Sequence, residues 1–269
     1  MTTGTARTAG TLETVLRERR DGGRKLLVPY VTAGVCANWV DFVVAAMDAG
    51  ADAVEIGIPF SDPVIDGPTI QRASVRALAR GTTPDTALGD LGGIDRSVPL
   101  IAMTYYNLVF QAGHRSFATR LCDGGVCGLI VPDLPVDESA GLTDDAAAAG
   151  VDTVLLAAPV TPEDRLAVIC QRSRGFVYGM GLMGVTGERT SLASSATAMA
   201  RRLKAATDMP VLIGVGVSTP QYAAEICADA DGVAIGAPLM RRVLEGQPPG
   251  AVAELVGAFR QALDQCGDQ

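Results

Sequence analysis

Three carboxylates, Glu55, Asp62 and Asp66, lie close together in the segment 53–71. Glu55 interrupts a short apolar run that is typical of a β-strand, and the two aspartates follow in the turn-rich segment after Pro59. A carboxylate in such a run is costly to bury unless it is paired, hydrogen-bonded or protonated. Glu55 is therefore either a functional group or a sign that the strand is misassigned.

Alternation of side chains along a strand puts Glu55 on the same face as Ala53 and Gly57. This face is made of small residues and leaves space around the carboxyl group. Each acid also has a purely structural alternative. Glu55 fits an acid at a strand edge that pairs with an arginine, Asp66 fits a helix cap, and Asp62 fits a turn residue.

Other kinds of chemistry have little support in this sequence. His114 is its only histidine, so a histidine-based triad or a multi-histidine metal site is not expected. Cys122 and Cys127 form a C-x4-C pair without a second pair or a nearby histidine, and we predict no metal there. Any reaction is therefore expected to depend on carboxylates.

Short apolar strands alternate with helical patterns along the whole chain, which favours a parallel sheet. We predict one domain over residues 1–269: a single (β/α)8 (TIM) barrel with an extra N-terminal helix and additional helices near the C-terminus. An open doubly wound sheet is the alternative. Residues 1–10 are expected to be flexible. The predicted strands are 26–31, 53–58, 98–104, 126–131, 152–157, 175–180, 210–215 and 231–235. The predicted helices between them include one near 115–122 and one over 137–149, and Thr83 and Thr161 are the predicted caps of two others.

A barrel of this kind has its active site at the C-terminal ends of the strands, with phosphate bound near the last strands. Glycine-rich turns follow the sixth, seventh and eighth predicted strands, at 184–187, 214–216 and 236–237. Glycine lets backbone N–H groups approach an oxyanion closely. These turns are candidates for a phosphate site, although each one alone also fits an ordinary structural turn.

Composition limits the class of partner. The chain has 269 residues, 48% of them hydrophobic, and a net charge of −8 without a basic stripe. This balance argues against nucleic acid and anionic membranes as partners. The N-terminus lacks an apolar signal core, and no apolar run approaches the roughly 18 residues of a membrane span, so we expect a cytoplasmic protein with reduced cysteines.

The segment 55–71 reads Glu-Ile-Gly-Ile-Pro-Phe-Ser-Asp-Pro-Val-Ile-Asp-Gly-Pro-Thr-Ile-Gln and closely resembles the signature of the tryptophan synthase α-subunit family. The likeness extends to 28–30, 105–110, 132–135, 184–187 and 214–216. It implies a lyase, active without a cofactor or metal, that cleaves indole-3-glycerol phosphate to indole and glyceraldehyde 3-phosphate. It also implies a tryptophan synthase β subunit as partner in an α2β2 type assembly.

The resemblance also implies roles for individual residues. Glu55 would protonate indole C3 and remove the glycerol hydroxyl proton, with a pKa raised by apolar surroundings. Asp66, staying ionised, would accept the indole N–H, and Tyr178 would hydrogen-bond near the catalytic acid. The remaining expected contacts are Tyr30, Met103, Ile130 and Leu156 at the indole, Tyr105 elsewhere on the substrate, Thr186, Gly187, Gly214, Gly216, Gly236 and Ala237 at the phosphate, and Asp62 and Pro63 facing the β subunit.

Two departures from the family pattern leave alternatives open. Ala237 stands where family members often have serine, and Leu182-Met183 replaces a more polar stretch. The alternatives are a free-standing lyase that supplies indole to a specialised pathway, and a weakly active α-like partner that mainly activates a β subunit. A phosphosugar isomerase on the same barrel is the candidate from another enzyme class.

Overall fold

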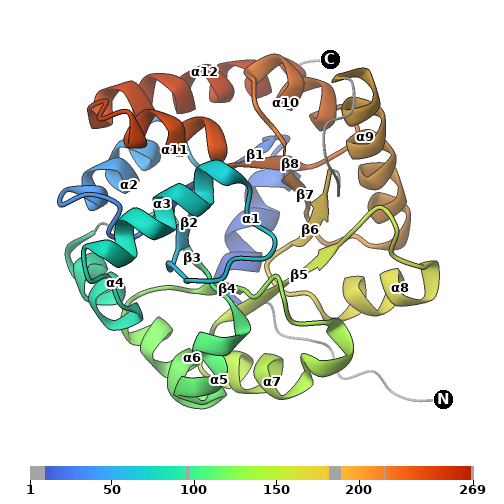
Figure 1. Cartoon of the computed structure of the whole chain (residues 1–269). Coiled ribbons are helices and arrows are strands. Elements are labelled where there is room, and N and C mark those ends of the chain that lie inside the picture. The colour runs from blue at the N-terminus through green and yellow to red at the C-terminus, as the bar shows by residue number, and fades with distance from the viewer. Residues whose placement is uncertain (1–9, 95–96, 182–188, 215, 268–269) are drawn as a thin grey trace.

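The chain forms a closed barrel of eight parallel strands surrounded by helices (Figure 1). A computed structural model describes residues 10–94, 97–181, 189–214 and 216–267. Each strand pairs with the next along the chain, and β8 pairs with β1. The predicted barrel and its eight strands are confirmed, and the open sheet is wrong. The strands are β1 (Leu26–Thr32), β2 (Val54–Gly57), β3 (Leu100–Met103), β4 (Gly128–Ile130), β5 (Asp152–Ala157), β6 (Val177–Met180), β7 (Val211–Gly214) and β8 (Gly232–Ile235).

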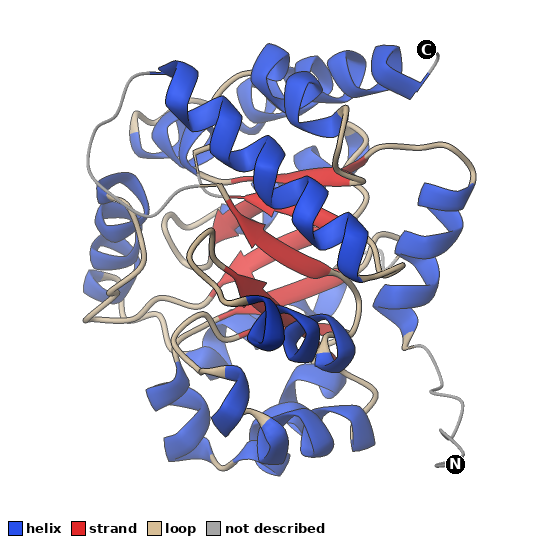
Figure 2. Cartoon of the chain, turned by 90° about the vertical axis from the view of Figure 1, so that its right-hand side faces the viewer, coloured by secondary structure: helices blue, strands red, loops and turns tan. Residues whose placement is uncertain are grey.

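Helices cover the outside of the barrel, and Figure 2 shows them around the central sheet. Among the described residues, no helix has the length and apolar character needed to cross a membrane. The helices are α1 (Thr11–Asp21), α2 (Trp39–Asp48), α3 (Pro68–Ala79), α4 (Pro84–Asp90), α5 (Tyr106–Ala112), α6 (His114–Asp123), α7 (Ala140–Ala148), α8 (Glu163–Arg172), α9 (Arg189–Ala206), α10 (Pro220–Cys227), α11 (Ala237–Leu244) and α12 (Pro249–Gly267).

Some helix predictions need correction. The sequence does not predict α5, which precedes the expected helix near 115–122. The helix expected over 137–149 is divided into a 3-10 turn, Val136–Glu138, and α7. Thr161 does not cap α8, because the N-cap residue is Pro162 and the Thr161 hydroxyl instead accepts a hydrogen bond from the Ala158 N–H at 2.9 Å. The cap predicted for α4 is present as a reciprocal hydrogen-bond pair between Thr83 and Thr86.

The strand faces follow the predicted alternation. Val54, Ile56 and Ile58 pack outward against the helices, whereas Ala53 belongs to the smaller core inside the barrel. In that inner core Leu12 of α1 fills the lower end, and a Cβ on Gly128 would lie 2.7 Å from its Cδ2 atom. Because α1 closes one end, the interior is open only at the C-terminal ends of the strands.

Buried ion pairs hold the closed end together. Asp52, directly before β2, is fully buried and pairs with Arg19 at 3.1 Å, Arg24 at 2.7 Å and Arg260 at 3.1 Å. It also accepts a hydrogen bond from the Leu27 N–H at 2.8 Å. One carboxylate thus joins α1, β1 and α12. A buried charge with this many partners is strongly destabilising to break, because the remaining charges lose their compensation.

We expect Asp52→Asn to lower the free energy of unfolding by about 3 kcal/mol, because the variant leaves three arginines without their shared carboxylate. Asp208→Asn is the matched control. Its carboxyl group pairs with Arg17 at 3.0 Å but is 88% exposed, so the loss should stay below about 1 kcal/mol. Chemical denaturation of both variants measures the difference. Equal losses would contradict a structural function for the Asp52 cluster.

Candidate active site

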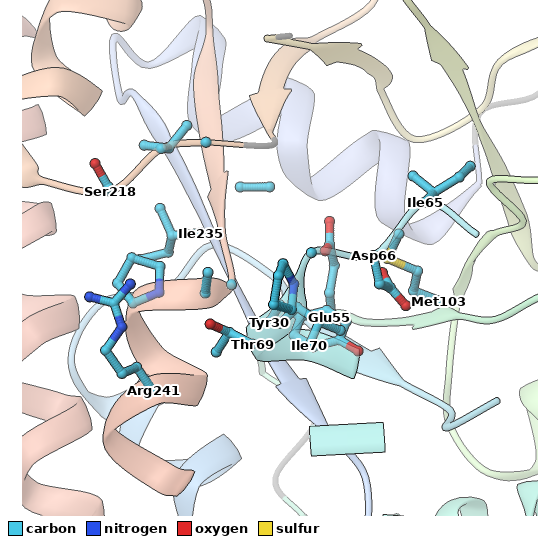
Figure 3. A pocket seen from close by; sticks show the side chains of 18 of the residues that line it. Tyr30, Glu55, Ile65, Asp66, Thr69, Ile70, Met103, Ser218, Ile235 and Arg241 are labelled. Atoms are coloured by element: carbon cyan, nitrogen blue, oxygen red, sulfur yellow. The ribbon is translucent and has the colours of Figure 1, made fainter. Parts of the chain in front are cut away.

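A cavity of about 240 Å³ opens at the C-terminal ends of β1, β2, β3, β6, β7 and β8 (Figure 3). Its walls come from strand ends and from the loops and helices that follow them, as expected for this fold. The lining residues are Tyr30, Glu55, Ile65, Asp66, Gly67, Pro68, Thr69, Ile70, Met103, Tyr178, Gly216, Val217, Ser218, Ala234, Ile235, Gly236, Ala237, Pro238 and Arg241.

Glu55 projects from β2 into this cavity and is 2% exposed. Its Oε1 atom is buried and has no hydrogen-bond partner within the described part of the chain. Burial raises the pKa of the carboxyl group to about 8, because the charged form is poorly solvated there. The arginine-paired alternative is therefore not supported, and the predicted rise in pKa is confirmed. At neutral pH this carboxyl group holds a proton that it can donate.

Two tyrosines flank the carboxyl group and owe their positions to glycines on neighbouring strands. A Cβ on Gly57 would lie 1.8 Å from the Tyr30 hydroxyl, and a Cβ on Gly214 would lie 1.9 Å from the Tyr178 hydroxyl. Burial raises the pKa of both phenols, and the nearby carboxyl groups of Asp66 and Glu55, where charged, raise it further. Both hydroxyls therefore stay neutral and leave the proton of Glu55 available for chemistry.

Asp66 lies on the loop between β2 and α3 and is held by Tyr105. The Tyr105 hydroxyl hydrogen-bonds the Asp66 carboxyl group and accepts the Ile65 N–H at 3.2 Å. Phe60 stacks on the Tyr105 ring, with centroids 5.1 Å apart. Burial raises the pKa of Asp66, and the bond from Tyr105 opposes that rise. The helix-cap alternative is wrong, because Gly67 is the N-cap residue of α3 and receives no side-chain cap.

The predicted phosphate residues are only partly brought together. Gly216, Gly236 and Ala237 line the cavity, and Gly216 has a φ of +89°, which favours glycine. Gly214 does not line it, because it lies behind the Tyr178 hydroxyl. Gly236 is the N-cap residue of α11, so the helix start faces the cavity. Predictions for Thr186, Gly187, Leu182 and Met183 lie outside the described residues.

Tyr105, which holds Asp66, does not line the cavity, and four other predicted site residues also lie away from its wall. Ile130 and Leu156 pack in the inner core beside Tyr178 and Met103, so they support the wall from below. Asp62 is exposed and accepts a hydrogen bond from the Ser61 hydroxyl at 2.5 Å, which fits the turn alternative. Pro63 beside it is half-buried. The substrate and partner contacts expected of these residues stay predictions.

Sequence reasoning missed several residues of the wall, among them Thr69, Ser218 and Arg241. The signal for both hydroxyl residues was present: Thr69 lies in the first turn of α3, close after Asp66, and Ser218 lies on the loop after β7, close after Gly216. Arg241 lies one turn into α11, where no motif singles it out. Within the described ranges, no cluster of histidine, cysteine, aspartate and glutamate has the arrangement of a metal site.

Comparison with known proteins places the chain among relatives of one kind. Residues 16–263 match the family described as "Tryptophan synthase alpha chain". A protein of that description from a Picosynechococcus species is 38% identical over 255 residues, which cover 92% of this chain and 97% of the relative. Another, from Halobacterium salinarum, is 43% identical and covers 85% of this chain and 86% of the relative.

Solved structures agree with the sequence relatives. The crystal structure of tryptophan synthase subunit alpha from Legionella pneumophila superimposes with a TM-score of 0.87 at 31% identity, covering 96% of this chain and 100% of the other. A chain of Mycobacterium tuberculosis tryptophan synthase gives 0.87 at 34% identity, covering 95% and 99%. The extent and identity of these matches, together with the barrel and its signature segment, show that the chain belongs to the tryptophan synthase alpha chain family.

Proposed function

We propose that the chain is the α component of a tryptophan synthase and cleaves indole-3-glycerol phosphate to indole and glyceraldehyde 3-phosphate. The observation that supports this most directly is the buried, unpaired carboxyl group of Glu55 inside the cavity, whose pKa burial raises to about 8. Asp66 supplies a second acid on the wall, and the start of α11 lies away from it (Figure 3). This arrangement suits a substrate with an aromatic amine at one end and a phosphate at the other.

The reaction breaks the bond between indole C3 and the first carbon of the glycerol chain. In our proposal Glu55 gives its proton to C3, and Asp66 accepts a hydrogen bond from the ring N–H where positive charge develops. The glycerol hydroxyl then returns a proton to Glu55 while its oxygen becomes the aldehyde of glyceraldehyde 3-phosphate. The electrons of the broken bond restore the indole ring, so Glu55 ends the cycle as it began.

Because the first step needs a protonated Glu55, we expect kcat/KM to fall as pH rises through about 8, approaching tenfold per pH unit. Glu55→Gln should reduce indole release to below a few per cent of the wild-type rate while the substrate still binds. An indole-release assay across pH, with calorimetric titration of the variant, measures both effects.

Protein stability provides the control for Glu55→Gln. The raised pKa means that the folded protein binds more protons than the unfolded chain between about pH 4.5 and 8, so wild-type stability falls across this window. Glutamine does not ionise, so the variant does not lose stability in this way, and it should be at least as stable as the wild type at pH 8. A stable variant that still releases indole at a substantial rate would exclude Glu55 as the acid.

We expect Asp66→Asn to lower kcat by about a hundredfold or more, because it removes the charge opposite the ring N–H. Tyr105→Phe should have a smaller effect with a diagnostic pH dependence. Loss of the hydroxyl raises the pKa of Asp66, so the acid limb of the rate profile should move to higher pH. Full-range pH profiles of both variants distinguish this from a general loss of structure, which would leave the limb unmoved.

The end of the barrel at which the cavity opens also carries exposed apolar side chains that suit a protein partner. Val64 is 79% exposed, Phe110 63% and Val160 81%, and they follow the ends of β2, β3 and β5. Large exposed apolar side chains grouped at one end of a barrel are typical of interaction surfaces. We propose that this end docks a tryptophan synthase β subunit, with the loop that bears Asp62 and Pro63 beside it.

We expect the cognate β subunit to increase the rate of indole release, and Phe110→Asp to weaken its binding at least tenfold, because a charge then enters an apolar contact. Val44→Asp is the matched control: it adds the same charge at a 38% exposed valine on α2, outside these loops. Titration of β subunit into each variant, followed by turnover, gives the affinities. Equal effects of the two variants would contradict this docking surface.

A further inference from the structure

The cavity wall is divided by charge. Its ionisable acids, Glu55 and Asp66, lie toward one side of the view in Figure 3, and Arg241 lies toward the other, as do Ser218 and Ile235. Arg241 is the cation among the described residues that line the cavity. The protein as a whole has a net charge of −8, so a positive group at this wall is a local feature that composition does not predict.

Arg241 has no protein partner in the described part of the chain. Glu245 stands four residues further along, at a spacing that favours an ion pair, yet it accepts a hydrogen bond from the Gln247 side chain at 3.2 Å instead. The next residue, Arg242, is occupied, since its Nη1 donates to the Ala251 carbonyl at 2.6 Å. The guanidinium of Arg241 is thus the one of this adjacent pair that is available to a ligand.

The surrounding groups favour an anion. The hydroxyls of Thr69 and Ser218 line the same wall and have no partner among the described residues. The N-cap residue of α11, Gly236, and its first residue, Ala237, also line it, and a helix start favours negative charge. Ala237 has no hydroxyl or charge, so the side-chain contribution to anion binding must come from its neighbours.

We propose that Arg241 is a specificity-determining residue that supplies the positive charge for the phosphate of the substrate, so that the cavity accepts phosphorylated ligands in preference to uncharged alcohols. The inference rests on the proposed function and names one of its contacts. A guanidinium presents several N–H donors in a plane that matches phosphate oxygens, and such bonds are stronger than neutral ones. In this proposal the acid–base step belongs to Glu55 and Asp66, and Arg241 acts through binding.

The test titrates inorganic phosphate, glyceraldehyde 3-phosphate and indole into the full chain by calorimetry. We expect Arg241→Gln to weaken binding of both phosphates about threefold to tenfold, as for a charge-assisted bond that is partly exposed to solvent, and to leave indole binding unchanged. Arg241→Lys keeps the charge and should recover part of the loss. In turnover, KM for indole-3-glycerol phosphate should rise by the same factor while kcat changes less than twofold.

Arg242→Gln is the matched control, because it removes the same charge one residue away and outside the cavity wall. It should leave phosphate binding within twofold of the wild type. The wild-type KM should also rise more steeply with ionic strength than the KM of Arg241→Gln. Salt screens the attraction between Arg241 and the phosphate, and the variant lacks that attraction. A purely structural function for Arg241 would not alter this salt dependence.

Phosphate affinity in Arg241→Gln equal to that of the wild type, or an equal loss in Arg242→Gln, would overturn the assignment. So would a wild-type chain that binds neither phosphate. These outcomes are separate from failure of the proposed reaction. A wild-type chain that releases no indole, with or without a β subunit, would refute the lyase function, and the inorganic phosphate titrations would still decide the role of Arg241.

Discussion

The cost of burying the Glu55 carboxyl group without a partner is the constraint on which the site depends. A charged carboxylate in this position would lose its hydration and gain nothing in return, so the group keeps its proton to about pH 8. That outcome requires neighbours that are small or neutral. Ala53 and Gly57 leave the space, and the Tyr30 and Tyr178 hydroxyls provide polar but uncharged walls. One added arginine would pair with the carboxylate and remove the available proton.

In the described part of the chain, buried carboxyl groups are paired with cations at the closed end of the barrel and are not paired with cations at the open end. At the closed end, Asp52 is surrounded by arginines, and Asp231 accepts from Lys204 at 2.9 Å and from the Val211 N–H at 2.8 Å. Those acids stabilise the fold because their charges are compensated. At the open end, Glu55 has no such partners and Asp66 depends on Tyr105. Stability and chemistry therefore come from different ends of one set of strands, as is general for this architecture.

The sequence predicts what depends on local pattern and misses what depends on contacts between distant segments. Strand alternation is local, and it suffices to place Glu55 inside the barrel among small residues. The start of α5 is not local, since its Tyr106 N–H donates to the Asp133 carboxylate at 2.8 Å from the loop after β4. In the sequence Gly214 looks like part of a phosphate-binding turn. In the structure it is a glycine because a Cβ there would collide with the Tyr178 hydroxyl on the neighbouring strand. Arg241 belongs to the wall only because α11 begins at the cavity, and no spacing in the sequence shows that.

The protonated state of Glu55 also bears on how an acidic protein accepts a phosphate ester. Negative charges repel one another more strongly in a partly buried site than in water, so an ionised Glu55 would oppose the approach of an anion. The proton on Glu55 removes that repulsion. Linkage makes the effect reciprocal, because a bound anion favours the protonated form of Glu55 and raises its pKa further. Binding of the phosphate therefore favours the protonation state of Glu55 that the proposed chemistry needs.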